Sequence, residues 1–161
     1  MVGMKRACGL GILVLIGTLA AARAEVAAPP SLNGDAMILY ASNDKGGIDG
    51  KIGKLPQLKK PPFSQFKSYK LLERAKLTLA KDVAASLSLP SGAVISITYK
   101  GVTQPKKAGD PVLAALVATL KKADGSSLPS QGISAKLGDT VFVSGGSFKT
   151  GVILVAVKLT P

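Results

Sequence analysis

Apolar and polar residues alternate with a period of two along most of the chain that follows residue 70. The alternation is clearest in three stretches bounded by turn-forming residues, 76–79, 86–89 and 95–100. Because successive side chains of a strand point to opposite faces, this period is typical of strands with one buried face. Two β-branched runs, 141–143 and 152–159, follow near the end of the chain. The pattern predicts an antiparallel meander of strands.

The region before residue 71 is less regular. A short apolar run at 36–41 predicts the first strand, and turn-forming residues fill 42–50. Ile48, Ile52 and Leu55 share helical spacing, which favours a turn or two of helix. The glycines in that stretch oppose it, since each disfavours a helix by about 1 kcal/mol relative to alanine.

Residues 111–122 fit two patterns. Five apolar residues lie on one helical face: Val112, Leu113, Leu116, Val117 and Leu120. Asp110 and Pro111 are typical of a helix N-terminus. Leu116, Ala118 and Leu120 also alternate, and the Asp124 and Gly125 pair that follows is typical of a hairpin turn, which requires a strand before it. We predict a strand, because a lone helix would interrupt a consistent succession of strands.

The first 24 residues have the three parts of a cleavable secretory signal peptide. Lys5 and Arg6 precede the uncharged, mostly apolar stretch 7–22, and Ala22 and Ala24 supply the small side chains that a signal peptidase reads. That stretch is shorter than the roughly 20 residues that a membrane span needs, and no later apolar run is long enough. We expect cleavage before Glu25 and export to the periplasm or the cell exterior, with no span left in the processed chain.

These signals predict the organisation of the whole chain: a signal peptide at 1–24, a flexible lead at 25–35, and a single domain at 36–161. The predicted fold is mainly β, an antiparallel β-sandwich of about seven strands with at most one short helix near the N-terminal end.

The processed chain contains no cysteine, histidine or tryptophan, since Cys8 belongs to the signal peptide. Without cysteine there are no disulfides and no thiol catalysis. Without histidine there is no Ser-His-Asp triad, and zinc, copper and haem sites lose their usual ligands. We therefore expect no enzymatic activity, no metal site and no cofactor.

Three parts of the chain resemble an uncharacterised group of small exported bacterial β-rich proteins: 38–43, 61–63 followed by 69–72, and 138–157 with its paired glycines. The resemblance covers most of the processed chain. It implies strands on either side of the turn at Asp124 and Gly125, and it implies no known activity. The stretch 138–146 is also similar to strands of outer-membrane secretin channels, from which no function is carried over.

Two short motifs offer a catalytic alternative. Ser64 and Lys67 form S-x-x-K, and the later K-T-G begins at Lys149, in the order found in acyltransferases of the penicillin-binding type. Ser64 would be the nucleophile and Lys67 its proton acceptor. The middle Ser-x-Asn motif is missing, and Ser42 with Lys45 matches S-x-x-K equally well. We interpret these residues as turn and surface positions.

Asp44 and Asp49 lie among glycines and could supply oxygen ligands to calcium. No glutamate closes the loop at the position an EF-hand requires, and neighbouring lysines would repel a cation. We predict an ordinary glycine turn capped by aspartate and asparagine.

Positive charge is concentrated in one segment. Loss of the signal removes three of the 21 basic residues and no acid, which leaves 18 against 9 and a net charge of +9. Residues 45–81 hold ten of those 18 and only two acids. Four lysines form the predicted binding face for an anionic partner: Lys59, Lys60, Lys67 and Lys70.

Three aromatic residues accompany these charges: Phe63, Phe66 and Tyr69. Aromatic contacts to a ligand are one interpretation, and packing against the core is the one we favour. Suitable partners for the lysine face are acidic proteins, glycans or lipid headgroups. Arg74 is the sole arginine after residue 24, which disfavours nucleic acid because bidentate contacts to bases and phosphates use arginine.

The sequence thus favours an exported, non-enzymatic structural or interaction protein of the bacterial envelope. Besides the Ser-Lys enzyme, the remaining alternative is an envelope assembly subunit that pairs through an exposed β edge. The oligomeric state is left open.

Overall fold

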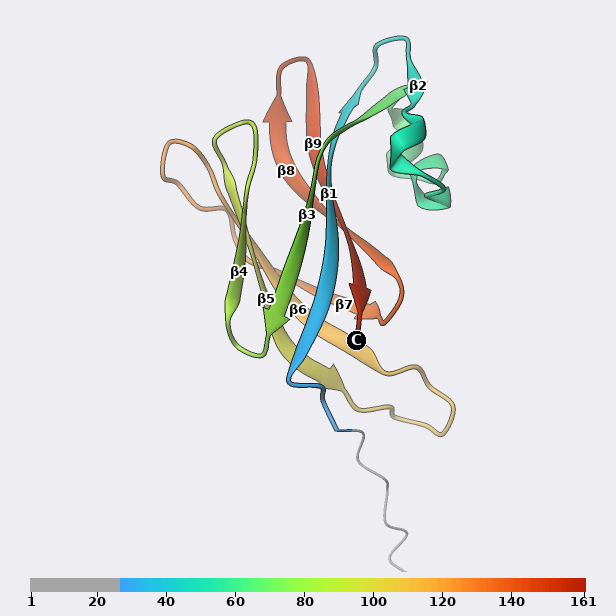
Figure 1. The fold of residues 1–161 in the computed structure, drawn as a ribbon, viewed down its shortest axis with the longest axis vertical. Helices are drawn as coiled ribbons and strands as arrows, with labels where there is room; N and C mark the ends of the chain where they lie inside the picture. Colours follow the sequence, from blue (N-terminus) through green and yellow to red (C-terminus); the bar gives the residue numbers. More distant parts are fainter. Residues whose placement is uncertain (1–26) are drawn as a thin grey trace, which may run out of the picture.

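Two β-sheets face each other in the computed structural model of the chain, which describes residues 27–161 (Figure 1). One sheet has the strand order β2-β3-β1-β9-β8 and the other β4-β5-β6-β7. The predicted mainly β sandwich is confirmed, with nine strands in the described residues where about seven were predicted. The strands are β1 (Ser31–Ser42), β2 (Gly47–Ile48), β3 (Ser68–Ala80), β4 (Ala84–Ser88), β5 (Val94–Thr103), β6 (Leu113–Lys121), β7 (Gln131–Lys136), β8 (Thr140–Phe148) and β9 (Gly151–Thr160). The predicted signal peptide lies outside the described residues.

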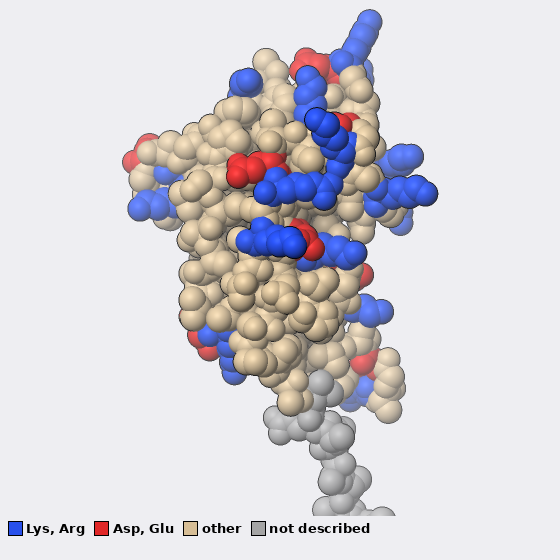
Figure 2. All heavy atoms as spheres, viewed as in Figure 1, with Lys and Arg blue, Asp and Glu red and all other residues tan. Residues whose placement is uncertain are grey.

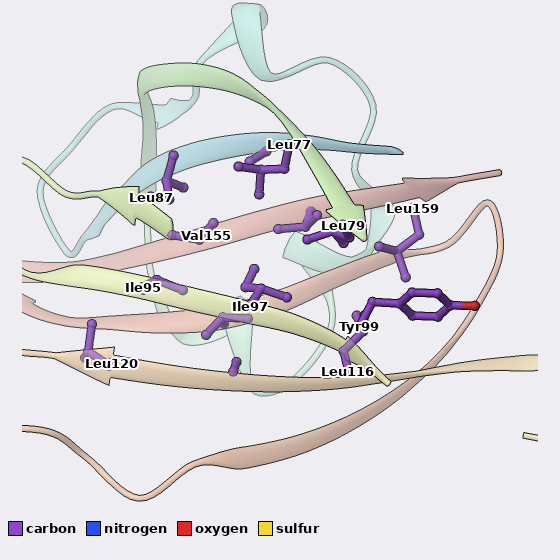
Figure 3. Packing of buried hydrophobic residues seen from close by; sticks show 14 of the residues in the cluster. Leu77, Leu79, Leu87, Ile95, Ile97, Tyr99, Leu116, Leu120, Val155 and Leu159 are labelled. Carbon is purple, nitrogen blue, oxygen red and sulfur yellow. The ribbon is translucent and has the colours of Figure 1, made fainter. Parts of the chain in front are cut away.

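The core between the sheets is built from the residues that alternate in the sequence. Strands β3, β4, β5, β6 and β9 turn every second side chain inward, and Figure 3 shows these side chains meeting from both sheets. Ile95 and Ile97 are 0% and 1% exposed, and Tyr99 on the same strand is 0% exposed. Each fully buried Ile or Leu contributes about 1.5–3 kcal/mol through the hydrophobic effect.

The ambiguous stretch at 111–122 forms a strand, as predicted. β6 pairs with β5 on one side and β7 on the other. After β6 the chain turns through Asp124, whose carboxylate accepts a hydrogen bond from the Ser126 amide at 2.8 Å. Gly125 has a φ of 86°, a conformation that glycine adopts without strain.

β1 begins at Ser31, so the predicted lead at 25–35 is too long and the domain starts before residue 36. Residues 25–34 contain two prolines, a serine and a glycine, all of low strand propensity, and offer little to bury, which is why the sequence indicated a flexible segment. Pairing overrides that propensity, because β1 lies between β3 and β9 and is hydrogen-bonded on both sides. A side chain at Gly34 would meet Val157 Cγ1 at 3.1 Å, so glycine suits this close packing.

The connectivity is more complex than the predicted meander. Strands β4 to β7 do follow one another antiparallel. In the five-stranded sheet, however, β1 pairs with the last strand, β9, and β2 runs parallel to β3. The pairing of β1 with β9 joins the two ends of the domain in one sheet and brings together residues that are far apart in the sequence.

A second layer covers the outer face of the five-stranded sheet. We name residues 43–67, between β1 and β3, the covering segment. It holds β2 and three 3-10 helices, η1 (Gly50–Ile52), η2 (Pro56–Lys59) and η3 (Phe63–Gln65), and lies to one side in Figure 1. Glycines and prolines divide the segment into single turns, so the predicted helix near the N-terminal end becomes three short 3-10 turns.

Candidate anion-binding face

Apolar side chains anchor the covering segment to the sheet. Ile52 and Leu58 are 3% and 2% exposed, and they pack with Leu39 and Leu154 on the outer face of β1 and β9. The Phe63 ring meets the Phe142 ring of β8 at 4.7 Å between centroids. Burial of these side chains holds the segment in one arrangement on the sheet.

The aromatic residues of the basic region belong to this anchor. The apolar residues between the covering segment and the sheet form what we name the outer cluster. Phe63 and Phe66 are half-buried against this cluster, and Tyr69, a member of it, is 1% exposed. The Phe66 and Tyr69 rings meet edge to face at 6.2 Å, and the Tyr69 hydroxyl donates to the Phe63 carbonyl oxygen. The predicted packing role is confirmed, and these rings are not displayed as a stacking surface.

The lysines of the covering segment point the other way. The segment carries six lysines that are all exposed: Lys45, Lys51, Lys54, Lys59, Lys60 and Lys67. Its acids are Asp44 and Asp49. In Figure 2, which keeps the view of Figure 1, Lys and Arg side chains project on the side where this segment lies. The segment is therefore amphipathic, with an apolar inner surface and a cationic outer surface.

Three of the four lysines predicted for the binding face lie in the covering segment. Lys59 ends η2 and Lys60 follows it, while Lys67 precedes β3 and its amide donates to the Ser42 carbonyl at 3.0 Å. Lys70 is different. It lies on β3 between Tyr69 and Leu71, whose side chains belong to the outer cluster, so its own side chain projects from the opposite face of the sheet.

Among the residues that the structure describes, no carboxylate forms an ion pair with a lysine of the covering segment. Within residues 27–161, the ion pair shorter than 4.0 Å joins Lys100 of β5 and Asp82 of the β3–β4 turn at 3.0 Å. The Asp49 carboxylate caps η1, because it accepts a hydrogen bond from the Lys51 amide at 3.0 Å. That backbone hydrogen bond lowers the pKa of Asp49. Most of the positive charge of this surface is thus uncompensated.

Sequence reasoning missed a second group of cationic residues. They line a hollow of about 500 Å³ next to η1 of the covering segment. Arg74, Lys76 and Lys158 line it, together with Asp35 and an apolar floor of Met37 and Ile52. Strand register produces this group. Asp35 lies directly opposite Lys76 on β3 and directly opposite Lys158 on β9. The sequence shows only that these polar residues alternate with apolar ones along each strand, and this alternation does not reveal which strands pair.

Arg74 links the hollow to the covering segment. Its guanidinium donates a hydrogen bond to the backbone carbonyl of Lys51 in η1. The single arginine after residue 24 is thereby used to fasten η1 to β3, with its charge left at the rim of the hollow. The lysines of the segment and the cations of the hollow together form what we name the cationic face.

The two motifs of the catalytic alternative lie on different elements, and no hydrogen bond joins them among the described residues. Ser64 is exposed in η3, and within the described residues its hydroxyl makes no hydrogen bond to Lys67. Lys149 lies in the β8–β9 turn with a φ of 51°, and its ammonium lies 5.4 Å from the centre of the Phe148 ring. Among residues 27–161, no three potential metal ligands of the Asp, Glu, His or Cys type gather at one point.

Burial of Tyr69 predicts a pH effect at the anchor. Burial raises the pKa of Tyr69 above its ordinary value, because the folded state favours the neutral phenol. Its stabilising contribution is complete below about pH 10, the unfolded value, and is lost as the pH rises through the higher folded pKa. At pH 8 we expect Tyr69→Phe to cost about 1 kcal/mol, the value of a lost hydrogen bond.

The difference in the free energy of unfolding between the original protein and Tyr69→Phe should become smaller above pH 10. Urea unfolding of both proteins from pH 8 to pH 12 measures this difference. Both proteins contain the same lysines and Tyr99, so the difference between their free energies of unfolding reports on Tyr69 alone. Two curves that stay parallel over this range would contradict the assignment.

Comparison of this chain with protein-family models, with curated protein sequences and with solved structures finds no match. No helix in residues 27–161 is long and apolar enough to cross a membrane.

Proposed function

We propose that the protein is an exported, non-enzymatic structural or interaction protein of the bacterial envelope, and that it contacts an anionic partner through the cationic face. One observation carries this proposal: six exposed lysines, without a carboxylate partner among residues 27–161, lie on a layer that apolar packing holds in place. A packed layer loses little further conformational freedom when a ligand binds, so its charges are presented at low entropic cost.

The type of cation favours a partner with dispersed negative charge. Lysine is a compact, strongly hydrated point charge on a flexible stem, whereas arginine binds carboxylate and phosphate groups bidentately. The cations of the covering segment are lysines alone. An acidic glycan, an acidic protein surface or anionic lipid headgroups suit such a face, and base-specific nucleic-acid recognition does not.

The absence of enzymatic activity rests on the residues that remain after processing. Imidazole and thiol groups are missing from residues 25–161. The Ser64 hydroxyl, which the catalytic alternative needs as a nucleophile, has no base within hydrogen-bonding distance among the described residues. These residue types support the proposal that the processed chain does not catalyse a reaction through an activated nucleophile of the usual kind.

Binding to heparin, used as a model polyanion, tests the proposal. The processed protein should bind at low salt and lose affinity steeply as salt rises, because binding releases counterions. The variant with Lys59→Gln and Lys60→Gln should bind several-fold more weakly and reduce the slope of log K against log salt by about 1 per lysine.

A matched control uses another adjacent lysine pair, Lys106 and Lys107, which is exposed in the β5–β6 connection outside the cationic face. Lys106→Gln with Lys107→Gln removes the same charge and should leave the affinity close to that of the original protein. Equal losses for the two variants would mean that only net charge matters, and an absence of binding at low salt would end the proposal.

A further inference from the structure

One edge of the five-stranded sheet combines length with an absence of charged side chains. The strands at the edges of the two sheets are β2, β8, β4 and β7. β2 has two residues, β4 has five, and β7 has six and ends in Lys136. β8 has nine residues and none of them is charged. Natural edge strands are kept short, charged or bulged to prevent pairing with other chains. β8 is the longest edge strand here, and its bulge between Ser144 and Gly146 leaves residues 140–144 regular.

The backbone groups that β8 leaves free follow from its pairing with β9. The Leu159 amide donates to the Asp139 carbonyl at 3.1 Å, and the Leu159 carbonyl accepts from the Gly138 amide at 2.8 Å. The backbone of Leu159 therefore faces β8, and so do those of Val157 and Val155, because residues two apart on a strand face the same neighbour.

Val157 and Val155 lie directly opposite Val141 and Val143. The N–H and C=O groups of these two β8 residues consequently point to β9, and those of Thr140, Phe142 and Ser144 point away from the sheet. Within the described residues, no backbone hydrogen bond from another element reaches these outward groups. The register shifts only between Ser144 and Gly146, so 140–144 is a regular stretch of free edge.

We propose that this edge pairs with the same edge of a second copy of the chain, antiparallel and centred on Phe142. In that register Phe142 lies opposite Phe142 of the second copy, and Thr140 lies opposite Ser144 of the second copy. Each of these positions has its backbone groups directed outward, so each opposed pair exchanges two N–H···O=C bonds. The side chains that meet are an aromatic pair and hydroxyl pairs, both of which are favourable across strands.

Charge disfavours the pairing of two copies along the other long stretch of free edge, which belongs to β3. The processed chain carries a net charge of +9, so two copies repel each other over most of their surfaces. β3, which β2 covers only at Ser68 and Tyr69, would bring four charged side chains into such an interface: Lys70, Glu73, Arg74 and Lys76. The regular part of β8 is neutral and complementary to itself, and it forms a closed two-fold pair.

Sedimentation of the processed protein at several concentrations tests the pairing. We expect a reversible dimer whose fraction increases at 0.5 M salt, since salt screens the repulsion between copies. Heparin binding has the opposite salt dependence, so failure of one proposal is distinguishable from failure of the other.

Two variants locate the interface. Ser144→Lys adds a charge at an exposed position of the proposed interface and should weaken dimerisation at least ten-fold. Ser134→Lys makes the same change at an exposed position of β7, the edge strand of the other sheet, and should leave the dimer intact. A dimer that persists in Ser144→Lys would overturn the proposal, and so would a wild-type protein that stays monomeric.

Amide hydrogen exchange gives a readout at the backbone itself. The amides of Thr140, Phe142 and Ser144 should exchange fast in dilute protein and slow down as the dimer forms. Those of Val141 and Val143, bonded to β9, should be protected at every concentration. Fast exchange of the outward amides in a concentrated sample would overturn the proposal, because it would show that the edge is free or that it serves a strand from a different protein.

Discussion

Gly151→Ala is expected to lower the free energy of unfolding by about 3–4 kcal/mol, the upper range for a single substitution. Gly151 opens β9 beside the end of β1. A Cβ atom at this position would overlap the carbonyl oxygen of Ala41 and lie 3.0 Å from its carbonyl carbon and from Tyr40 Cε2. The obstacle is the backbone of a central strand, which cannot rotate away as a flexible side chain can.

Gly132→Ala is the matched control. Gly132 also lies in a strand, β7, and a Cβ atom there would meet nothing within 4 Å. This substitution should leave stability unchanged or raise it by about 0.5 kcal/mol, because alanine reduces the entropy of the unfolded chain. Urea unfolding of both variants measures the difference. Equal effects would mean that the approach of Gly151 to Ala41 is not a constraint on the fold.

The period of two was sufficient to predict the sandwich because each strand that it marks has one buried face. The same reasoning applies to two apolar runs that do not alternate. The runs at 36–41 and 152–157 are apolar without alternation, a pattern typical of strands buried on both faces. β1 and β9 are those strands, with the core on one side and the covering segment on the other. The apolar composition of both runs therefore indicates a second layer on the outer face of their sheet.

The candidate site was only partly predictable, for a reason that lies in the topology. Lys59 and Lys60 are adjacent in sequence and exposed, so their charge could be located directly. The hollow combines Arg74 and Lys76 with Lys158, from strands that never pair with each other and are joined only through β1 between them. Alternation shows which face of its own strand a residue occupies, whereas strand order and register depend on the whole sandwich.

In the proposed dimer, the cationic faces of the two copies would lie on the same side. A two-fold axis between antiparallel strands is perpendicular to the sheet, so pairing through β8 leaves both outer faces on the same side of one continuous sheet. Each outer face carries its own covering segment. The dimer would therefore present two cationic faces to the same partner, and simultaneous contact would raise the effective affinity for an extended anionic surface.

Leu58→Ala tests whether the covering segment is a unit that can open without the sandwich. Leu58 is 2% exposed, and its side chain packs in the outer cluster, separate from the core between the sheets. Truncation of a buried leucine costs about 3 kcal/mol, which corresponds to roughly a hundred-fold increase in the opening constant of the structure that it holds. Amide exchange in residues 50–66 should accelerate by about that factor, while amides of β5 and β6 keep their protection.

Ile97→Ala is the comparison, because it makes a cavity of similar size in the core between the sheets. It should accelerate exchange in the sandwich as well as in the covering segment, since the segment needs the sheet beneath it. Leu58→Ala changes no charge, so weaker heparin binding by this variant would measure the contribution of an ordered layer to the affinity. Unchanged exchange at 50–66 would mean that the Arg74 and Tyr69 hydrogen bonds, rather than apolar packing, hold the lysines in place.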